Sequence, residues 1–333
     1  MEQKKHFDEI PLLTSILCLG VIIIHVTSLP LGTLAQTSLW YKLLFVINKF
    51  FVFCVPTFLF LSGFKLHNKY KNGIGVLSFY KNRIRKILCP YLVAVLLYYL
   101  YFLAKGWVSL ASFPASVGLG TISAHFYYVI VSCQLYALFP LLLQALEKND
   151  KLTLALSCII TVLFGQYLHF PYSDRFAGTY LFYFVLGMFV SKNDLYDKWK
   201  TGSALIWLLF LVVGAAHITL LYRFVCGKFF YGCAELVNMV YVLLSMVAIF
   251  RLCAVCKRFD FIRKAASRLN AQSYNIYLYH CLILSVVRYE LFPKLCLAPK
   301  YEFLLLCALL AGAVTIYCLI PPAGKAKHKT IPL

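Results

Sequence analysis

A histidine lies inside the first long apolar run of the chain, where an aliphatic residue would cost less free energy. The stretch LCLGVIIIHVTSLP, residues 17–30, places His25 directly after three isoleucines. Ionisable residues are expensive inside a membrane span and are therefore default candidates for function. Histidine has an unperturbed pKa of about 6.5, so it can take a proton from a hydroxyl group at neutral pH. The alternative is a histidine that only hydrogen-bonds a neighbouring helix.

A second group of polar side chains occurs within one short apolar run near the end of the chain. The stretch SYNIYLYHCLIL, residues 273–284, contains Ser273, Asn275, Tyr277 and His280. Irregular or polar groups at membrane depth are tolerated where they line a cavity or contact protein. We therefore expect this segment to line a cavity rather than to face lipid.

Two arginines stand at the start of another apolar run. The stretch FYKNRIRKILCPYL, residues 79–92, carries Arg83 and Arg85. The planar guanidinium group can bind phosphate through two parallel hydrogen bonds. Contact with lipid headgroups at the membrane surface is the alternative.

Two further stretches contribute small or polar residues to apolar surroundings. FFVFCVPTFLFLSGFKL, residues 50–66, contains Ser62 and Gly63, which permit close approach of another backbone. HFYYVIVSCQLYALFPLL, residues 125–142, begins with His125, which we expect at the outer surface, and continues with Gln134 and Tyr136 inside the run.

These residues must be positioned by helices that cross a membrane. The chain has 333 residues, of which 62% are hydrophobic and only 13% are charged, against about a quarter charged in a soluble domain. Its repeated apolar segments are long enough to span a bilayer as helices. The sequence therefore predicts an all-α polytopic membrane protein in a single domain, residues 1–333. About ten transmembrane helices are expected, at approximately 12–30, 44–66, 87–104, 124–146, 152–170, 176–191, 203–222, 233–250, 273–289 and 303–320.

The distribution of basic residues predicts the orientation. With the N-terminus inside, most of the 32 lysines and arginines fall in cytoplasmic segments, and both termini are cytoplasmic. The net charge of +20 is therefore explained by this bias and by anionic lipids, without a nucleic-acid partner. A phosphate-rich cytosolic ligand at residues 81–86 and 256–264 is a second interpretation.

The 13 cysteines are scattered through the expected spans. No second pair accompanies Cys253 and Cys256, so no metal site is expected. Buried cysteines that act as small apolar residues are the simpler interpretation.

Taken together and in order, these stretches resemble the acyltransferase-3 family of integral membrane proteins over about residues 8–320. The resemblance implies a ten-helix enzyme that transfers an acyl group, often acetyl from acetyl-CoA, to hydroxyls of cell-envelope sugars. The matching pieces are His25, VPTFLFLSGF (55–64), FYKNRIRKILCPYL (79–92), HFYYVIVSCQLYALFPLL (125–142), YLFYFVLGMFV (180–190) and SYNIYLYHCLIL (273–284).

On this resemblance His25 is the expected catalytic base. We expect acyl-CoA as co-substrate, no bound cofactor, a plasma (inner) membrane location with several passes, and contact with membrane lipids. The acceptor is expected to be an envelope glycan or a lipid-linked sugar. The expected substrate-binding residues are Arg83 and Arg85 on the CoA phosphates, Ser62 and Gly63 along the thioester tunnel, and His125, Ser273, Asn275, Tyr277 and His280.

Two positions depart from the family pattern. Members usually carry an arginine eleven residues before the first-helix histidine, where this chain has Thr14, and a tryptophan where it has Tyr127. Losing the arginine removes a fixed charge that could hold a donor or a developing oxyanion. Either Arg83 or Arg85 substitutes for it, or acyl transfer is altered or lost. The alternatives are a transporter or flippase of a glycan or small polar solute on the same fold, and a purely structural membrane subunit.

Overall fold

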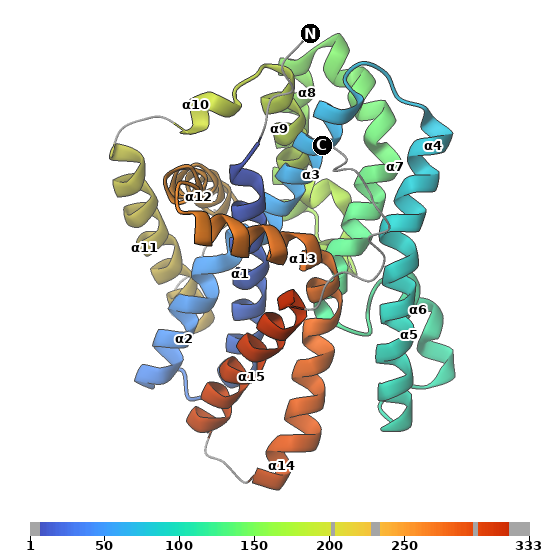
Figure 1. Cartoon of the computed structure of the whole chain (residues 1–333). Helices are drawn as coiled ribbons and strands as arrows, with labels where there is room; N and C mark the ends of the chain where they lie inside the picture. The colour runs from blue at the N-terminus through green and yellow to red at the C-terminus, as the bar shows by residue number, and fades with distance from the viewer. Residues whose placement is uncertain (1–6, 201–203, 228–233, 296–298, 320–333) are drawn as a thin grey trace. The chain divides into compact units, whose positions relative to one another are not determined.

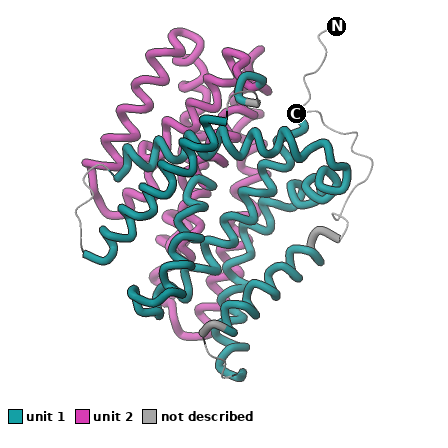
Figure 2. Tube along the Cα trace, turned by 90° about the vertical axis from the view of Figure 1, so that its left-hand side faces the viewer, with its two compact units in different colours: residues 1–54, 197–332 teal, residues 55–196, 333 magenta. Residues whose placement is uncertain are grey.

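The computed structural model describes residues 7–200, 204–227, 234–295 and 299–319. The chain divides into two compact units, which Figure 2 shows in different colours. Unit 1 comprises residues 1–54 and 197–332, and unit 2 comprises residues 55–196. Unit 2 is thus one continuous piece of sequence, whereas unit 1 is assembled from two pieces.

Unit 1 is built from helices that occur at both ends of the chain (Figure 1). They are α1 (Glu9–Leu31), α2 (Leu39–Phe50), a 3-10 turn (Phe51–Phe53), α11 (Leu205–Val225), α12 (Ala234–Cys256), α13 (Asp260–Val286), a π-helical turn (Val287–Leu291), α14 (Phe292–Leu295) and α15 (Pro299–Leu319). The short helix α10 (Tyr196–Lys200) begins at the last residue of unit 2.

Unit 2 contains the middle helices and several short turns. They are α3 (Cys54–Tyr70), which begins at the last residue of the first piece of unit 1, α4 (Val76–Arg83), a π-helical turn (Ile84–Leu88), α5 (Cys89–Ala104), α6 (Phe113–Gly118), α7 (Tyr127–Lys148), α8 (Asp150–Val162), a second π-helical turn (Leu163–Tyr167) and α9 (Leu181–Lys192). The 3-10 turns lie at Leu110–Ser112, Ala124–Phe126, Ser173–Arg175 and Ala177–Tyr180.

Side-chain caps fix where two of these helices start. Ser38 Oγ accepts a hydrogen bond from the backbone N–H of Tyr41, at 3.1 Å, and starts α2. Asn149 Oδ1 accepts from the N–H of Leu152, at 3.0 Å, and starts α8 directly after α7 ends. Each cap satisfies a backbone donor that the first helical turn leaves unpaired.

Helix α1 is the centre of unit 1 and contacts α2, α12, α13 and α15 (Figure 1). Asn48 on α2 donates hydrogen bonds to the carbonyl oxygen of Ile24 and to Thr27 Oγ1, both at 2.9 Å. At the start of α1, Lys257 Nζ lies 2.8 Å from Oε1 of Glu9, whose side chain is fully buried. Polar contacts therefore tie α1 to its neighbours at both ends.

Close backbone packing joins α3 to α9 inside unit 2. A Cβ atom at Gly63 would overlap the carbonyl oxygen of Phe184, and one at Gly187 would overlap that of Phe60. Only glycine allows two helices to approach this closely. Around this contact Phe79, Phe139 and Phe184 belong to a buried apolar core.

The end of α3 is held by a buried histidine. His67 Nε2 lies 3.3 Å from Glu147 Oε1 of α7, and its Nδ1 lies 3.0 Å from Ser191 Oγ of α9. A carboxylate can only accept, so Nε2 carries the hydrogen, and in the neutral ring Nδ1 accepts from the serine hydroxyl. This imidazole therefore links three helices.

The prediction of an all-helical membrane protein is confirmed, since the described residues form helices and turns without a strand. Within them, six helical stretches are long and apolar enough to cross a membrane, and two further helices are apolar but shorter. The six are Glu9–Leu31, Leu39–Tyr70, Val76–Ala104, Ala124–Lys148, Leu205–Val225 and Ala234–Cys256, and the shorter two are Ala177–Lys192 and Tyr301–Ile316.

The number of ten spans and the cytoplasmic termini stay predictions, as does the single domain. The span expected at 152–170 coincides with α8, which is regular only to Val162 and then widens into a π-helical turn. The span expected at 273–289 lies in the second half of α13, where polar side chains lower the hydropathy. The terminal segments 1–6 and 320–333, including the last residue of the span expected at 303–320, lie outside the described residues.

Candidate active site

Two histidines face each other inside unit 1. The ring centroids of His25 on α1 and His280 on α13 lie 5.1 Å apart, with an angle of 57° between the ring planes. His280 is buried, with 2% of its surface exposed. The structure therefore brings together the expected catalytic base and one of the expected substrate-binding residues.

The two histidines meet because α1 packs against α13. Ser15 Oγ donates to the carbonyl oxygen of Ala266 at 2.9 Å, and Cys18 Sγ donates to that of Ser273 at 3.9 Å. Residue numbers increase together along these contacts, so α1 and the part of α13 from Ala266 to His280 run in the same direction. On α13, residues 266, 273 and 280 are seven apart, which places them on one stripe of the helix.

Backbone carbonyls fix the tautomer of His280. Its Nδ1 atom lies 2.8 Å from the carbonyl oxygen of Tyr277 and 3.2 Å from that of Ile276. Carbonyl oxygens only accept hydrogen bonds, so Nδ1 carries the hydrogen. In the neutral ring Nε2 is then an acceptor, and the thiol of Cys281, 3.3 Å away, donates to it.

Within the described part of the chain, His25, His280 and Cys281 bring together side-chain atoms that could bind a metal ion. The donor atoms of His25, His280 and Cys281 all lie within 4.8 Å of one another. Imidazole nitrogen and thiolate sulfur are the ligands that Zn²⁺ prefers, and three of them would leave one tetrahedral position open. The expectation that no metal is bound stays a prediction. Cys281 was not among the expected site residues, although it directly follows His280.

The other predicted residues of α13 divide into two groups. Tyr277 is buried, and its ring centroid lies 6.0 Å from that of His280. Asn275 lines the same cavity as His280. Ser273 instead donates to the carbonyl oxygen of Asn270, at 2.9 Å, within its own helix.

A second polar cluster lies inside unit 2 around Arg83. The guanidinium carbon of Arg83 lies 5.6 Å from the ring centroids of both Phe79 and Tyr136. The hydroxyls of Tyr136 and Ser62 form a hydrogen bond of 2.8 Å. Arg83 Nε is buried and has no hydrogen-bond partner among the described residues. The structure thus gathers Arg83 and Ser62 around Tyr136, which the sequence placed inside the span but not among the site residues.

The second arginine points elsewhere. Arg85 is exposed, whereas Arg83 is half-buried. Residues two positions apart on an α-helix differ by about 200° around its axis, so their side chains leave on opposite faces. The two arginines therefore differ in burial and direction, and binding of the CoA phosphates by both stays a prediction. Gly63 serves the contact with α9 described above, and its expected place along a thioester tunnel stays a prediction.

His125 is packed among aromatic rings. It is only 1% exposed, and its ring lies 5.8 Å from that of Tyr98 and 4.2 Å from that of Phe126. Ser123 Oγ lies 2.9 Å from its Nδ1. His125 is therefore buried within the protein, and its expected place at the outer surface of the membrane stays a prediction.

Thr14 provides no charge at the position where the family usually has arginine. Its side chain is 5% exposed, and Oγ1 is a buried atom without a hydrogen-bond partner in the described part of the chain. The surroundings of this position in unit 1 are therefore those of a small neutral side chain.

Comparison with known proteins indicates the family. A sequence model of a protein family, described as an acyltransferase domain, matches residues 8–320. A curated relative, "Putative membrane-bound acyltransferase YfiQ" of Bacillus subtilis, is 27% identical over 209 residues, which are 56% of this chain and 56% of the relative. The chain thus aligns with about half the length of that relative. No solved structure shows a significant match. Because the family model covers nearly the whole chain, this protein belongs to the acyltransferase-3 family.

Proposed function

We propose that the protein transfers an acyl group from acyl-CoA to a hydroxyl of a cell-envelope glycan or lipid-linked sugar, in the plasma membrane. Family membership supports acyl transfer in general. The observation that carries the chemistry is the pair of imidazoles of His25 and His280, 5.1 Å apart inside unit 1. Acetyl-CoA is the simplest acyl-CoA that could serve as the donor in this reaction.

In the proposed reaction His25 takes the proton of the acceptor hydroxyl as its oxygen attacks the thioester carbonyl. The carbon–sulfur bond of the thioester then breaks, and the CoA thiolate leaves with the proton that His25 had accepted. Histidine suits both steps, because it can hold and return a proton near neutral pH. His280 acts as a positioning residue, because its Nδ1–H is committed to the carbonyls of Tyr277 and Ile276.

Arg83 is the residue that we propose to bind the acyl-CoA donor. A buried guanidinium nitrogen without a partner is costly unless something hydrogen-bonds to it. A phosphate of CoA would supply such an acceptor and would offset the charge. Arg85, which is exposed, would contribute long-range attraction for the same anion.

The test uses the full chain, purified in detergent, with acetyl-CoA and a thiol reagent that detects released CoA. An acyltransferase should release CoA slowly alone and faster when an acceptor glycan is added. His25→Gln keeps a neutral hydrogen-bonding side chain but removes the base, so turnover should fall by about 10²- to 10⁴-fold.

A buried histidine elsewhere in unit 1 supplies the matched control. His217 is 2% exposed and packs against Tyr241, with ring centroids 5.5 Å apart. His217→Gln should leave turnover within a factor of about two, because it removes no base. If His25→Gln retains full turnover, the base is misassigned. If no acyl-CoA is consumed with any acceptor, the transporter alternative replaces the enzyme.

A further inference from the structure

We infer that the donor acyl chain binds in an apolar cavity beside His280, so that the protein accepts acyl groups longer than acetyl. This inference rests on the proposed function, because it concerns the donor of that reaction. It begins from a cavity of about 190 Å³ between α13 and α15 within unit 1.

The walls of this cavity connect the proposed reaction centre with apolar surface. His280 and Asn275 line it from α13, and Leu310, Ala313 and Val314 line it from α15. His280 is also the residue that faces His25. A thioester with its carbonyl carbon near the two imidazoles would therefore have this cavity next to its acyl chain.

A larger apolar groove adjoins the cavity. A second hollow, of about 710 Å³, shares Leu310 and Val314 with the first and is walled by α1, α2, α13 and α15. Its size falls in the range of about 300 to 1,000 Å³ that is usual for ligand pockets. An acetyl group, with one methyl beyond the carbonyl, would leave nearly all of this space empty.

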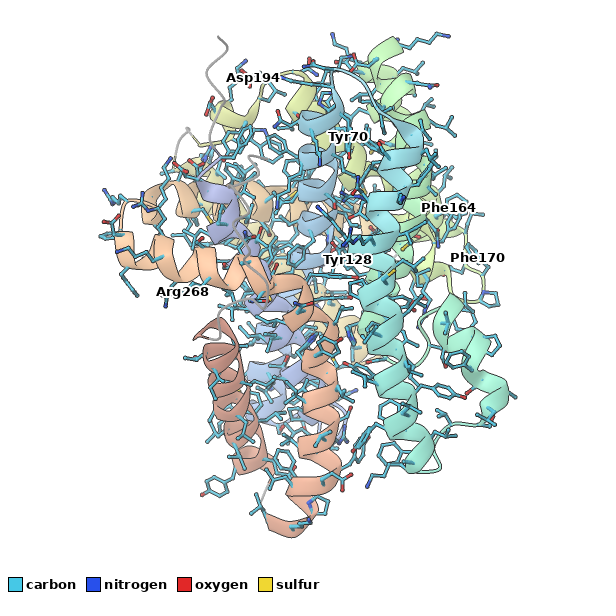
Figure 3. All side chains as sticks on the ribbon, turned by 45° about the vertical axis from the view of Figure 1, so that its right-hand side comes forward. Tyr70, Tyr128, Phe164, Phe170, Asp194 and Arg268 are labelled. Atoms are coloured by element: carbon cyan, nitrogen blue, oxygen red, sulfur yellow. The ribbon has the colours of Figure 1, made fainter. Side chains whose placement is uncertain are left out.

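The chemistry of the walls selects the occupant. Asn275, Tyr279 and His280 are the polar residues of the smaller cavity, and the rest of its wall offers no hydrogen bond to a sugar hydroxyl. A glycan would leave most of its hydroxyls unpaired there, so the cavity suits an apolar chain better. A methylene chain gains free energy for each group removed from water. The competing occupant is a membrane phospholipid, because Arg268, labelled in Figure 3, lies in the wall of the larger groove and could contact its phosphate.

The experiment measures binding of acetyl-, butyryl-, hexanoyl- and octanoyl-CoA to the full chain in lipid nanodiscs. Each added methylene should tighten binding by up to about fourfold until the cavity is filled, from roughly 0.8 kcal/mol per methylene. The experiment measures binding of the donor alone, so the acceptor does not have to be known.

Ala313 and Ala308 make a matched pair of variants on α15. Ala313 lines the cavity, and Ala313→Leu should narrow it, reducing the gain for octanoyl-CoA while leaving acetyl-CoA binding within about twofold. Ala308 is exposed and lines neither hollow, so Ala308→Leu should change nothing.

The outcomes separate this inference from the proposed function. If all four acyl-CoA compounds bind with the same affinity, the inference is overturned and the proposed acyl transfer still stands. A gain with chain length that Ala313→Leu does not reduce would also overturn it, since it would reflect partition into the lipid. A phospholipid that copurifies and is not displaced by octanoyl-CoA would assign the groove to lipid. If no acyl-CoA binds at all, both proposals fail.

Discussion

The Nδ1 atom of His280 lies 2.8 Å from the carbonyl oxygen of Tyr277, one turn earlier in α13. This bond holds the imidazole against its own helix and turns Nε2 toward the thiol of Cys281. The ring that faces His25 therefore has a fixed hydrogen position and a fixed orientation.

From this arrangement we expect His280→Ala to lower kcat more than it raises KM for acyl-CoA. Removing a residue that orients the base should affect the transition state more than ground-state binding, by about 10- to 100-fold in kcat. Steady-state kinetics over a range of acyl-CoA concentrations separate the two constants. A rise in KM at constant kcat would instead make His280 a binding residue, and His217→Ala is the control for loss of a buried imidazole.

The different directions of the two arginines predict different effects on donor binding. Arg83→Ala should weaken acyl-CoA binding by about 1.5 to 3 kcal/mol, the range of hydrogen bonds to charged groups. Arg83→Lys should recover only part, because a point charge cannot form the planar fork. Arg85→Ala should cost less and should lose its effect at high salt, because Arg85 is exposed. Titration calorimetry at two salt concentrations gives both results, and equal losses for the two alanine variants would contradict the distinction.

The contact between α3 and α9 predicts that Gly63→Ala is destabilising. The new Cβ would overlap the carbonyl oxygen of Phe184, which belongs to backbone and cannot turn away. Overpacking of this kind typically costs about 1 to 3 kcal/mol. Gly312 in α15 has nothing within 4 Å of its added Cβ. Gly312→Ala should therefore stabilise the helix by about 0.5 to 1 kcal/mol, and thermal unfolding in detergent compares the two.

Removing the hydroxyl of Thr14 should make the protein more stable. Thr14→Val keeps the shape and eliminates a buried oxygen that has no partner in the described part of the chain, for a gain of about 1 kcal/mol. Thr27→Val is the matched control, because Thr27 Oγ1 donates to the carbonyl of Ile23 at 2.7 Å and accepts from Asn48. We expect it to lower the unfolding temperature in the same assay. Thr14→Arg should destabilise, since a charge at this buried position would need a partner.

Much of the helical content was predictable, because long apolar runs between basic loops leave few other structures in a membrane. His25 and the polar run at 273–280 were visible as costly residues in apolar surroundings. The pairing of His25 with His280 was not, since the contacts that set it join Ser15 to Ala266 and Cys18 to Ser273 across 251 and 255 residues of sequence. The opposite directions of Arg83 and Arg85 follow from helix geometry and could have been foreseen. The roles of Tyr136 and Cys281 depend on packing that composition and spacing do not encode.

The ion pair between Glu9 and Lys257 joins residues 248 positions apart. At a synthesis rate of about 5 to 20 residues per second, Lys257 and α13 are made on the order of 10 to 50 s after α1. Unit 2, as one uninterrupted piece of sequence, is complete before then. Glu9 and His25 therefore spend the interval without their final neighbours from the second half of the chain. The order of membrane insertion thus makes closure of unit 1 around α1 the last step of assembly, and with it the formation of the histidine pair.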